Sequence, residues 1–185
     1  MADIPVKKTG FLAVGCTVLA GIAAAQTPSA RFGLGGGATI PTGDYKTTDK
    51  VGWHALGVVQ FGVPRSPVDI RVDGMYSRTS YDTTVTLASG STKLYGGLVS
   101  LVYNVGPKAL MARAYVLGGA GAYHAKFESG GSSVGETKFA FGGGGGVSFS
   151  LAAVHAFVEA RWVSVRMSGG SLSFFPLSAG LMFGT

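Results

Sequence analysis

The chain has few of the residues on which many classes of protein depend. Its 185 residues include one cysteine, Cys16, so no disulfide within the chain can support the fold. Charged residues make up only 13% of the sequence, which is about half their share in an average soluble domain. Apart from one segment near the N-terminus, no apolar run approaches the ~20 residues of a membrane-spanning helix. The composition therefore argues against both an ordinary soluble domain and an ordinary helical membrane protein.

The apolar segment near the N-terminus has the pattern of an export signal. Lys7 and Lys8 precede an apolar run at 11–25, which ends in three alanines. A positive region, an apolar region and a small-residue cleavage site together form a secretory signal peptide. We therefore predict that residues 1–25 are a cleaved signal peptide and that residues 26–185 form the mature domain. Cleavage removes the only cysteine, and the remaining basic residues are scattered singly, which argues against nucleic-acid binding.

Apolar and polar residues alternate in steps of two along the mature chain. In VDIRVDGMYS (68–77), one face carries alternating charges and the other carries apolar side chains. The segment AFVEARWV (156–163) repeats the pattern, which is typical of β-strands. Eight segments are predicted as strands: 30–40, 52–63, 68–78, 93–104, 111–125, 138–150, 155–166 and 173–183.

The lengths of these segments and of their connections indicate a barrel in a membrane. A tilted membrane strand needs about 9–11 residues, and every predicted strand reaches that length. Long polar connections at 41–51, 79–92 and 126–137 alternate with short turns. An even number of strands with long loops on one rim and tight turns on the other is typical of outer-membrane barrels. We predict an all-β fold, an eight-stranded antiparallel up-and-down transmembrane β-barrel.

The alternation also assigns the two faces of the predicted barrel. Apolar residues with aromatics at both ends match a lipid-facing surface with interfacial girdles. The predicted aromatic belt consists of Trp53, Tyr76, Tyr95, Tyr103, Trp162, Phe175 and Phe183. The charged residues at the alternate positions then point into the lumen, where unpaired charges are costly. Three acids and three bases are predicted to form a lumenal salt-bridge network: Asp69, Arg71, Asp73, Arg113, Glu159 and Arg161.

Four segments carry a resemblance to a known family. YVLGGAGAYH (115–124), KFAFGGGGGVSF (138–149), AFVEARW (156–162) and FFPLSAGLMFG (174–184) resemble the last four strands of Gram-negative outer-membrane β-barrels. The resemblance is to the OmpA/OmpX- and opacity-like eight-stranded barrels. It implies a location in the outer membrane and insertion by the barrel-assembly machinery, which reads a C-terminal aromatic such as Phe183. It implies no single activity, because members of the family differ in function.

The five consecutive glycines, Gly142–Gly146, resemble a phosphate-binding loop only in composition. A phosphate loop needs a lysine after its glycines and a helix to follow, whereas VSFS continues the alternation. We predict that the run is the middle of the sixth strand, next to Gly118, Gly119 and Gly121. Glycine there permits curvature and close approach of bulky neighbours.

No catalytic, cofactor or metal site is predicted. A lipid-modifying barrel enzyme would need a serine beside a histidine near the membrane rim, with a third group to orient the pair. His54 and His124 are the histidine candidates, with Ser91 or Ser129 as the serine, whereas His155 lies at the opposite rim. No metal-ligand motif accompanies them.

The sequence favours a structural or surface-interaction role, similar to that of an adhesin. The expected partners are outer-membrane lipid and lipopolysaccharide, together with an extracellular partner at the loops 41–51, 79–92 and 126–137. A small-solute channel is an alternative, although an eight-stranded interior is normally filled by side chains. A soluble periplasmic ligand-binding barrel is a further alternative, since it would also close a sheet on itself.

Overall fold

The computed structural model describes residues 29–47, 49–81, 90–106, 111–129, 132–151, 154–167 and 170–184. The predicted signal peptide at 1–25 and positions 82–89 of the predicted loop 79–92 lie outside the described residues. Within those ranges, no helix has the length and apolar character needed to cross a membrane.

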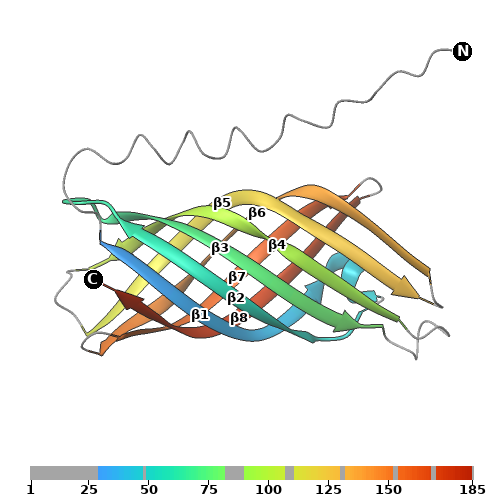
Figure 1. Ribbon diagram of the computed structural model, residues 1–185, viewed down its shortest axis with the longest axis horizontal. Coiled ribbons are helices and arrows are strands. Elements are labelled where there is room, and N and C mark those ends of the chain that lie inside the picture. The colour runs from blue at the N-terminus through green and yellow to red at the C-terminus, as the bar shows by residue number, and fades with distance from the viewer. Residues whose placement is uncertain are drawn as a thin grey trace, which may run out of the picture.

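Eight antiparallel strands close into one barrel, in which each strand pairs with its neighbours in sequence and β8 pairs with β1 (Figure 1). The predicted fold class is therefore confirmed. The elements are β1 (Ala30–Thr42), the 3-10 helix η2 (Gly43–Thr47), β2 (Gly52–Gly62), β3 (Val68–Ser80), β4 (Gly90–Val105), β5 (Ala112–Ser129), β6 (Ser132–Leu151), β7 (Val154–Met167) and β8 (Gly170–Gly184).

The two rims of the barrel differ. One rim, here called the terminal rim, carries the start of β1, the end of β8 and the turns after β2, β4 and β6; it lies on the left of Figure 1. The opposite rim, the loop rim, carries η2 and the ends of β3, β5 and β7. All strands alternate in direction, so every connection between neighbouring strands is confined to one rim.

Side chains inside the barrel are more polar than those outside it. Along β3, Arg71, Asp73, Met75 and Ser77 are buried, whereas the alternate residues between them are exposed. Many large apolar side chains face outward, including Leu34 at 74% and Leu101 at 60% exposure. All seven residues of the predicted aromatic belt lie on this outward face, with exposures between 37% and 53%. A polar interior with an apolar exterior is the arrangement expected in lipid rather than in water.

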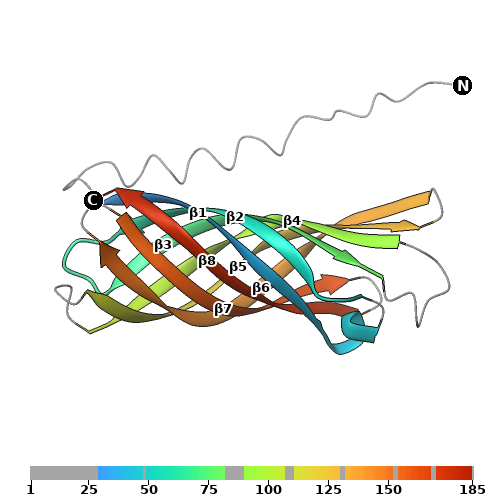
Figure 2. The same ribbon diagram turned by 90° about the horizontal axis from the view of Figure 1, so that it is seen from below.

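The predicted loop at 126–137 is mostly strand, which corrects the sequence-based boundary. β5 continues to Ser129 and β6 begins at Ser132, with those two residues paired. The segment is rich in serine and glycine, which resembles a loop, but backbone pairing between the two strands requires no particular side chains. β6 pairs with β7 only from Ala140 onward, so residues 132–139 extend past the end of this pairing (Figure 2). The connection at 41–51 also contains structure, since η2 occupies its first half.

The five glycines lie in the middle of β6, as predicted. Gly142 pairs with Gly119 and Gly143 pairs with Gly118 on β5. At Gly146, an added Cβ would lie 2.7 Å from the Tyr115 hydroxyl. The missing side chain at Gly146 therefore leaves room for Tyr115 in the lumen.

Candidate functional site

Four charged side chains meet in the middle of the lumen. Arg71 and Asp73 come from β3, and Glu159 and Arg161 come from β7, which is four strands away around the barrel. Residues two apart on a strand share a face, so each strand directs both of its charges inward. All four residues are at most 6% exposed. Their charges are therefore removed from bulk water on every side.

The four residues, here called the lumenal charge cluster, neutralise one another. Arg71 Nη1 donates to Glu159 Oε2 at 2.7 Å, and Arg161 Nη1 donates to Asp73 Oδ2 at 2.9 Å. Arg161 Nε also donates to Glu159. Arg71 Nε lies 3.9 Å from Asp73 Oδ2, which completes a ring of two bases and two acids. Removing one member of such a buried set leaves an uncompensated charge, which is strongly destabilising.

Two aromatic residues hold the cluster in place. The Tyr115 hydroxyl donates to Glu159 Oε2 at 2.8 Å. The Arg71 guanidinium carbon lies 5.4 Å from the centre of the Phe157 ring, within cation–π range. Tyr115 is not among the residues predicted from the sequence, although it lies two residues after Arg113 and therefore shares its inward face.

The other two residues of the predicted network lie closer to the terminal rim. Asp69 Oδ2 accepts hydrogen bonds from Gln60 Nε2 at 2.7 Å and from Asn104 Nδ2 at 2.9 Å. Arg113 makes a long contact of 3.5 Å from Nη2 to the Gly106 carbonyl oxygen. No ion pair between described residues joins either side chain to the charge cluster. The structure thus brings four of the six predicted residues together and places two apart, because alternation fixes the face of a residue but not its height in the barrel.

A chain of uncharged polar groups links the adjacent strands β8, β1, β2 and β3 on the loop side of the cluster. His54 Nδ1 lies 3.1 Å from Thr39 Oγ1, and His54 Nε2 lies 2.9 Å from Ser178 Oγ. Ser77 Oγ donates to Thr39 Oγ1 at 2.9 Å. This is a serine–histidine contact, but Thr39 occupies the position where a catalytic triad has a carboxylate. His54 is also 3% exposed, so its ring is enclosed among the strands that it links.

The remaining histidines have different partners from those considered for an enzyme. His124 Nδ1 lies 2.8 Å from Thr137 Oγ1, and its ring stacks on Tyr95. His155 Nδ1 lies 3.1 Å from Ser150 Oγ. The hydrogen bonds of the described residues do not join Ser91 to a histidine, and the side chain of Ser129 lies outside the described residues. In the described ranges, no three histidine, cysteine, aspartate or glutamate residues gather as metal ligands.

Buried side chains of the described residues fill the loop side of the lumen. Tyr45 on η2 is 5% exposed, and its hydroxyl lies 2.6 Å from Thr79 Oγ1. Thr79 Oγ1 donates in turn to Asp49 Oδ1 at 2.7 Å. Burial raises the pKa of Tyr45 above its ordinary value, so its hydroxyl stays protonated at neutral pH. Below it, a continuous set of buried apolar side chains fills the section: Leu94, Leu98, Tyr123, Val163, Val165, Leu172 and Phe174.

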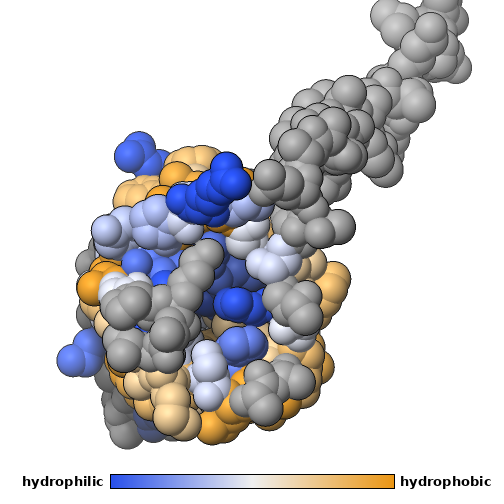
Figure 3. Space-filling model, turned by 90° about the vertical axis from the view of Figure 1, so that its left-hand side faces the viewer, coloured by the Kyte–Doolittle hydropathy of each residue, from blue (hydrophilic) through white to orange (hydrophobic). Residues whose placement is uncertain are grey.

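The terminal side of the lumen is hollow. A pocket of about 270 Å³ opens there, and it is lined by residues of β1 to β8 that include Arg31, Asp69 and Arg113. Figure 3 views this rim and shows hydrophilic residues within a surround of hydrophobic ones. Arg31 is not among the residues predicted from the sequence, although it lies at the start of the first predicted strand and could have been identified there. The two halves of one lumen therefore have opposite character.

Comparisons with known proteins agree with this architecture. The profile of the outer membrane protein beta-barrel domain matches residues 9–183. No curated protein sequence matches the chain. Among solved structures, Neisserial surface protein A has a TM-score of 0.69 at 16% identity, with 86% of this chain and 100% of that chain covered.

Two further structures are similar. The attachment invasion locus protein Ail of Yersinia pestis, solved in complex with the heparin analogue sucrose octasulfate, has a TM-score of 0.56 at 19% identity, with 85% of this chain and 100% of that chain covered. A major outer membrane protein from Thermus thermophilus has a TM-score of 0.54 at 11% identity, with 84% of this chain and 99% of that chain covered. At these identities the likeness shows a shared fold.

Proposed function

Because the chain belongs to the outer membrane protein β-barrel family, we propose that it is a non-conducting, non-catalytic barrel that acts through its cell-surface side. Its location is the outer membrane. In such barrels the short turns face the periplasm and the longer loops face outward. The terminal rim is therefore the periplasmic rim, and the loop rim is the extracellular rim.

The closed lumen is the observation that carries this proposal. The lumenal charge cluster fills the middle of the barrel, and Tyr45 with the apolar set below it fills the extracellular half. An eight-stranded barrel is only wide enough for its side chains. A protein whose interior is occupied in this way has its outer surfaces available for function.

A row of cations marks where the barrel would contact lipopolysaccharide. Arg78, Lys93 and Lys126 are direct cross-strand neighbours on β3, β4 and β5. Arg78 is exposed, and directly paired residues share a face of the sheet, so the row lies on the outward side. Tyr76 and Tyr95 lie two positions closer to the membrane along β3 and β4, and both are exposed members of the aromatic belt. Cations immediately above such a belt are placed to meet the phosphates of lipopolysaccharide.

The extension of β4, β5 and β6 supports an additional extracellular partner. Residues 132–139 have β5 on one side and extend past the end of the pairing with β7 on the other. An unpaired strand edge can add a strand from another chain. Glu136 and Lys138 form an ion pair of 3.2 Å on this segment, which provides charged groups to discriminate between partners.

Binding of polyanions to purified protein in neutral detergent tests the proposal. The probes are lipopolysaccharide and heparin, the second because the structurally similar protein Ail was solved with a heparin analogue. The test variant replaces the three cations together: Arg78→Gln, Lys93→Gln and Lys126→Gln. Each cation contributes about 1 kcal/mol near an anionic surface, so affinity should fall roughly a hundred-fold.

The matched control is Arg65→Gln, which removes an exposed cation from the opposite rim and should leave this binding unchanged. Failure of the wild-type protein to bind either polyanion would contradict the proposal. So would a triple variant that binds as tightly as the wild type.

A further inference from the structure

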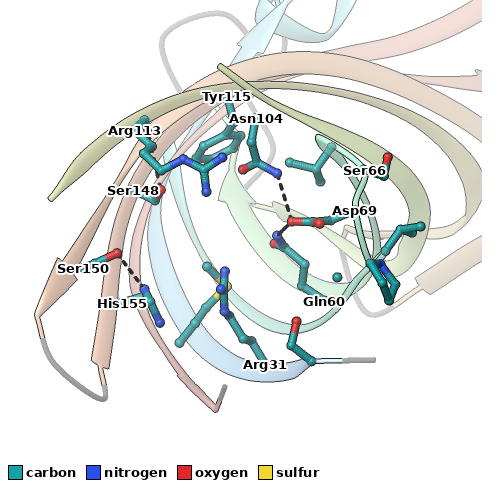
Figure 4. A pocket seen from close by; sticks show the side chains of 16 residues that line it. Arg31, Gln60, Ser66, Asp69, Asn104, Arg113, Tyr115, Ser148, Ser150 and His155 are labelled. Atoms are coloured by element: carbon teal, nitrogen blue, oxygen red, sulfur yellow. Dashed lines mark hydrogen bonds between the residues drawn. The ribbon is translucent and has the colours of Figure 1, made fainter. Parts of the chain in front are cut away.

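We propose that the pocket at the periplasmic rim binds a small oxyanion, a carboxylate or phosphate group presented from the periplasm. The pocket lies at the opposite end of the barrel from the surface assigned above. Its periplasmic exposure rests on the orientation proposed there, whereas anion binding in the pocket does not. The proposal rests on two arginines whose buried atoms lack partners, on the hydroxyl and imidazole groups beside them, and on the size of the space (Figure 4).

The two arginines have unmet hydrogen-bonding capacity. Arg31 lies on β1 and Arg113 on β5, and the Nε atom of each is buried without a hydrogen-bond partner in the described chain. Figure 4 shows both side chains directed into the pocket from separate walls. A buried N–H group without a partner costs free energy. An oxyanion in the pocket would offset the positive charge of these guanidinium groups and accept from their terminal nitrogens, because the guanidinium fork matches the geometry of carboxylate and phosphate oxygens.

The negative charge in the pocket is already engaged by other groups. Asp69 is the only carboxylate among the described residues that line the pocket. Two amide groups, from Gln60 and Asn104, donate to its Oδ2 atom. The described residues include no ion pair between Asp69 and either arginine. The arginine side of the pocket therefore keeps its positive charge for a ligand.

Neutral donors complete the arginine side. His155 and Ser150 are hydrogen-bonded to each other at 3.1 Å, and both line the pocket with Ser148. Tyr115 also lines the pocket, but its hydroxyl donates to Glu159 of the charge cluster. The pocket therefore ends at the cluster, and a ligand that enters from the periplasm has no described route onward.

The volume limits the size of the ligand. At about 270 Å³, the pocket is smaller than the roughly 300–1,000 Å³ typical of drug-sized ligands. It suits a small anion or the anionic end of a longer molecule. The rim is open, so a longer molecule could extend into the periplasm while its anionic end remains between the arginines.

Titration of the purified protein in neutral detergent tests this proposal. Inorganic phosphate and acetate are titrated separately in chloride buffer and followed by backbone amide NMR. We expect saturable shifts at residues lining the pocket with at least one of the two ions. Saturation with phosphate alone identifies a phosphate source, and saturation with acetate alone identifies a carboxylate source.

The variant Arg31→Gln/Arg113→Gln should weaken binding about ten-fold or more, as expected for loss of charge-assisted hydrogen bonds. Arg78→Gln on the outward face of β3 is the control and should bind as the wild type does. Each single arginine variant is measured as well, so that a folding defect in the double variant does not decide the result. Absence of saturable shifts with both ions would overturn the proposal, and so would equal affinity in the wild type and in both single variants.

Discussion

The two halves of the lumen are made by the same eight strands, yet they differ in what fills them. On the extracellular side, Leu94, Val165 and Phe174 are fully buried, and Tyr45 covers them. On the periplasmic side, a pocket of about 270 Å³ is lined mostly by polar and charged groups. The lumenal charge cluster lies between them. The comparison teaches that side chains fill the lumen only locally. One half is packed like a protein core, and the other remains accessible from its rim.

The largest expected effect comes from a substitution in the lumenal charge cluster, which separates the two halves. Glu159→Ala leaves Arg71 and Arg161 without their shared carboxylate, and it should lower the free energy of unfolding by about 3–5 kcal/mol. The measurement is urea-induced unfolding of the refolded protein in detergent. Glu136→Ala is the matched control: Glu136 pairs with Lys138 at 3.2 Å, but the two side chains are 33% and 32% exposed. It should cost at most about 1 kcal/mol. Equal losses in the two variants would contradict the account.

A second comparison removes side chains from each half separately. Leu94→Ala in the packed half should cost about 2–5 kcal/mol, because it creates a cavity among buried neighbours. Ser148→Ala on the wall of the hollow half removes only a long hydrogen bond of 3.3 Å to the Arg113 carbonyl oxygen and should cost at most about 1 kcal/mol. Denaturant unfolding of both variants provides the test, and similar losses would show that the halves are not packed differently.

A third prediction concerns the glycines of β6. An added Cβ at Gly146 would lie 2.4 Å from the Val158 carbonyl oxygen and 2.7 Å from the Tyr115 hydroxyl. Gly146→Ala should therefore strain the pairing with β7, displace Tyr115 from Glu159 and cost about 1–3 kcal/mol. At Gly143 the nearest neighbour of an added Cβ is 3.3 Å away, and Gly143→Ala is the control with a smaller expected loss. Unfolding midpoints of the two variants decide the matter. If Gly143→Ala is the more destabilising, the assigned role of the Gly146 position is wrong.

The smallest expected effect is at the extracellular cover. Tyr45→Phe removes the hydrogen bond to Thr79 and should cost about 0.5–1.5 kcal/mol at neutral pH. Burial raises the pKa of Tyr45 in the folded protein, so its contribution is fully present below a pH of about 10 and is lost as pH rises beyond it. Unfolding of the wild type and the variant at neutral and alkaline pH should therefore converge. A difference that grows with pH would contradict this assignment.

Which side chains of each strand face the lumen could largely be predicted from the sequence. The alternation in 68–77 places Arg71 and Asp73 on one face, and the same rule places Glu159 and Arg161 together. Because each strand pairs with its neighbours, the order of strands around the barrel follows from their order in the chain. The inward charges and outward aromatics are therefore properties of local pattern alone.

What the sequence could not provide is position along the barrel axis. Asp69 and Arg113 share the inward face with the cluster, but strand tilt and register place them at the periplasmic rim. The contact between His54 and Ser178 joins residues 124 positions apart and depends on closure of β8 onto β1. The segment 126–137 has the polar composition of a loop, whereas its backbone groups are satisfied by pairing. These features depend on contacts between strands, which no single segment specifies.

Ion conductance across a planar lipid bilayer tests the central claim most directly. The claim is that the charge cluster and the packed extracellular half prevent communication between the two rims. Refolded wild-type protein, with folding verified by heat-modifiable migration in gels, should insert without producing discrete current steps. Reproducible, long-lived current steps from the folded wild-type protein would contradict the account, because they would require a continuous path through the lumen.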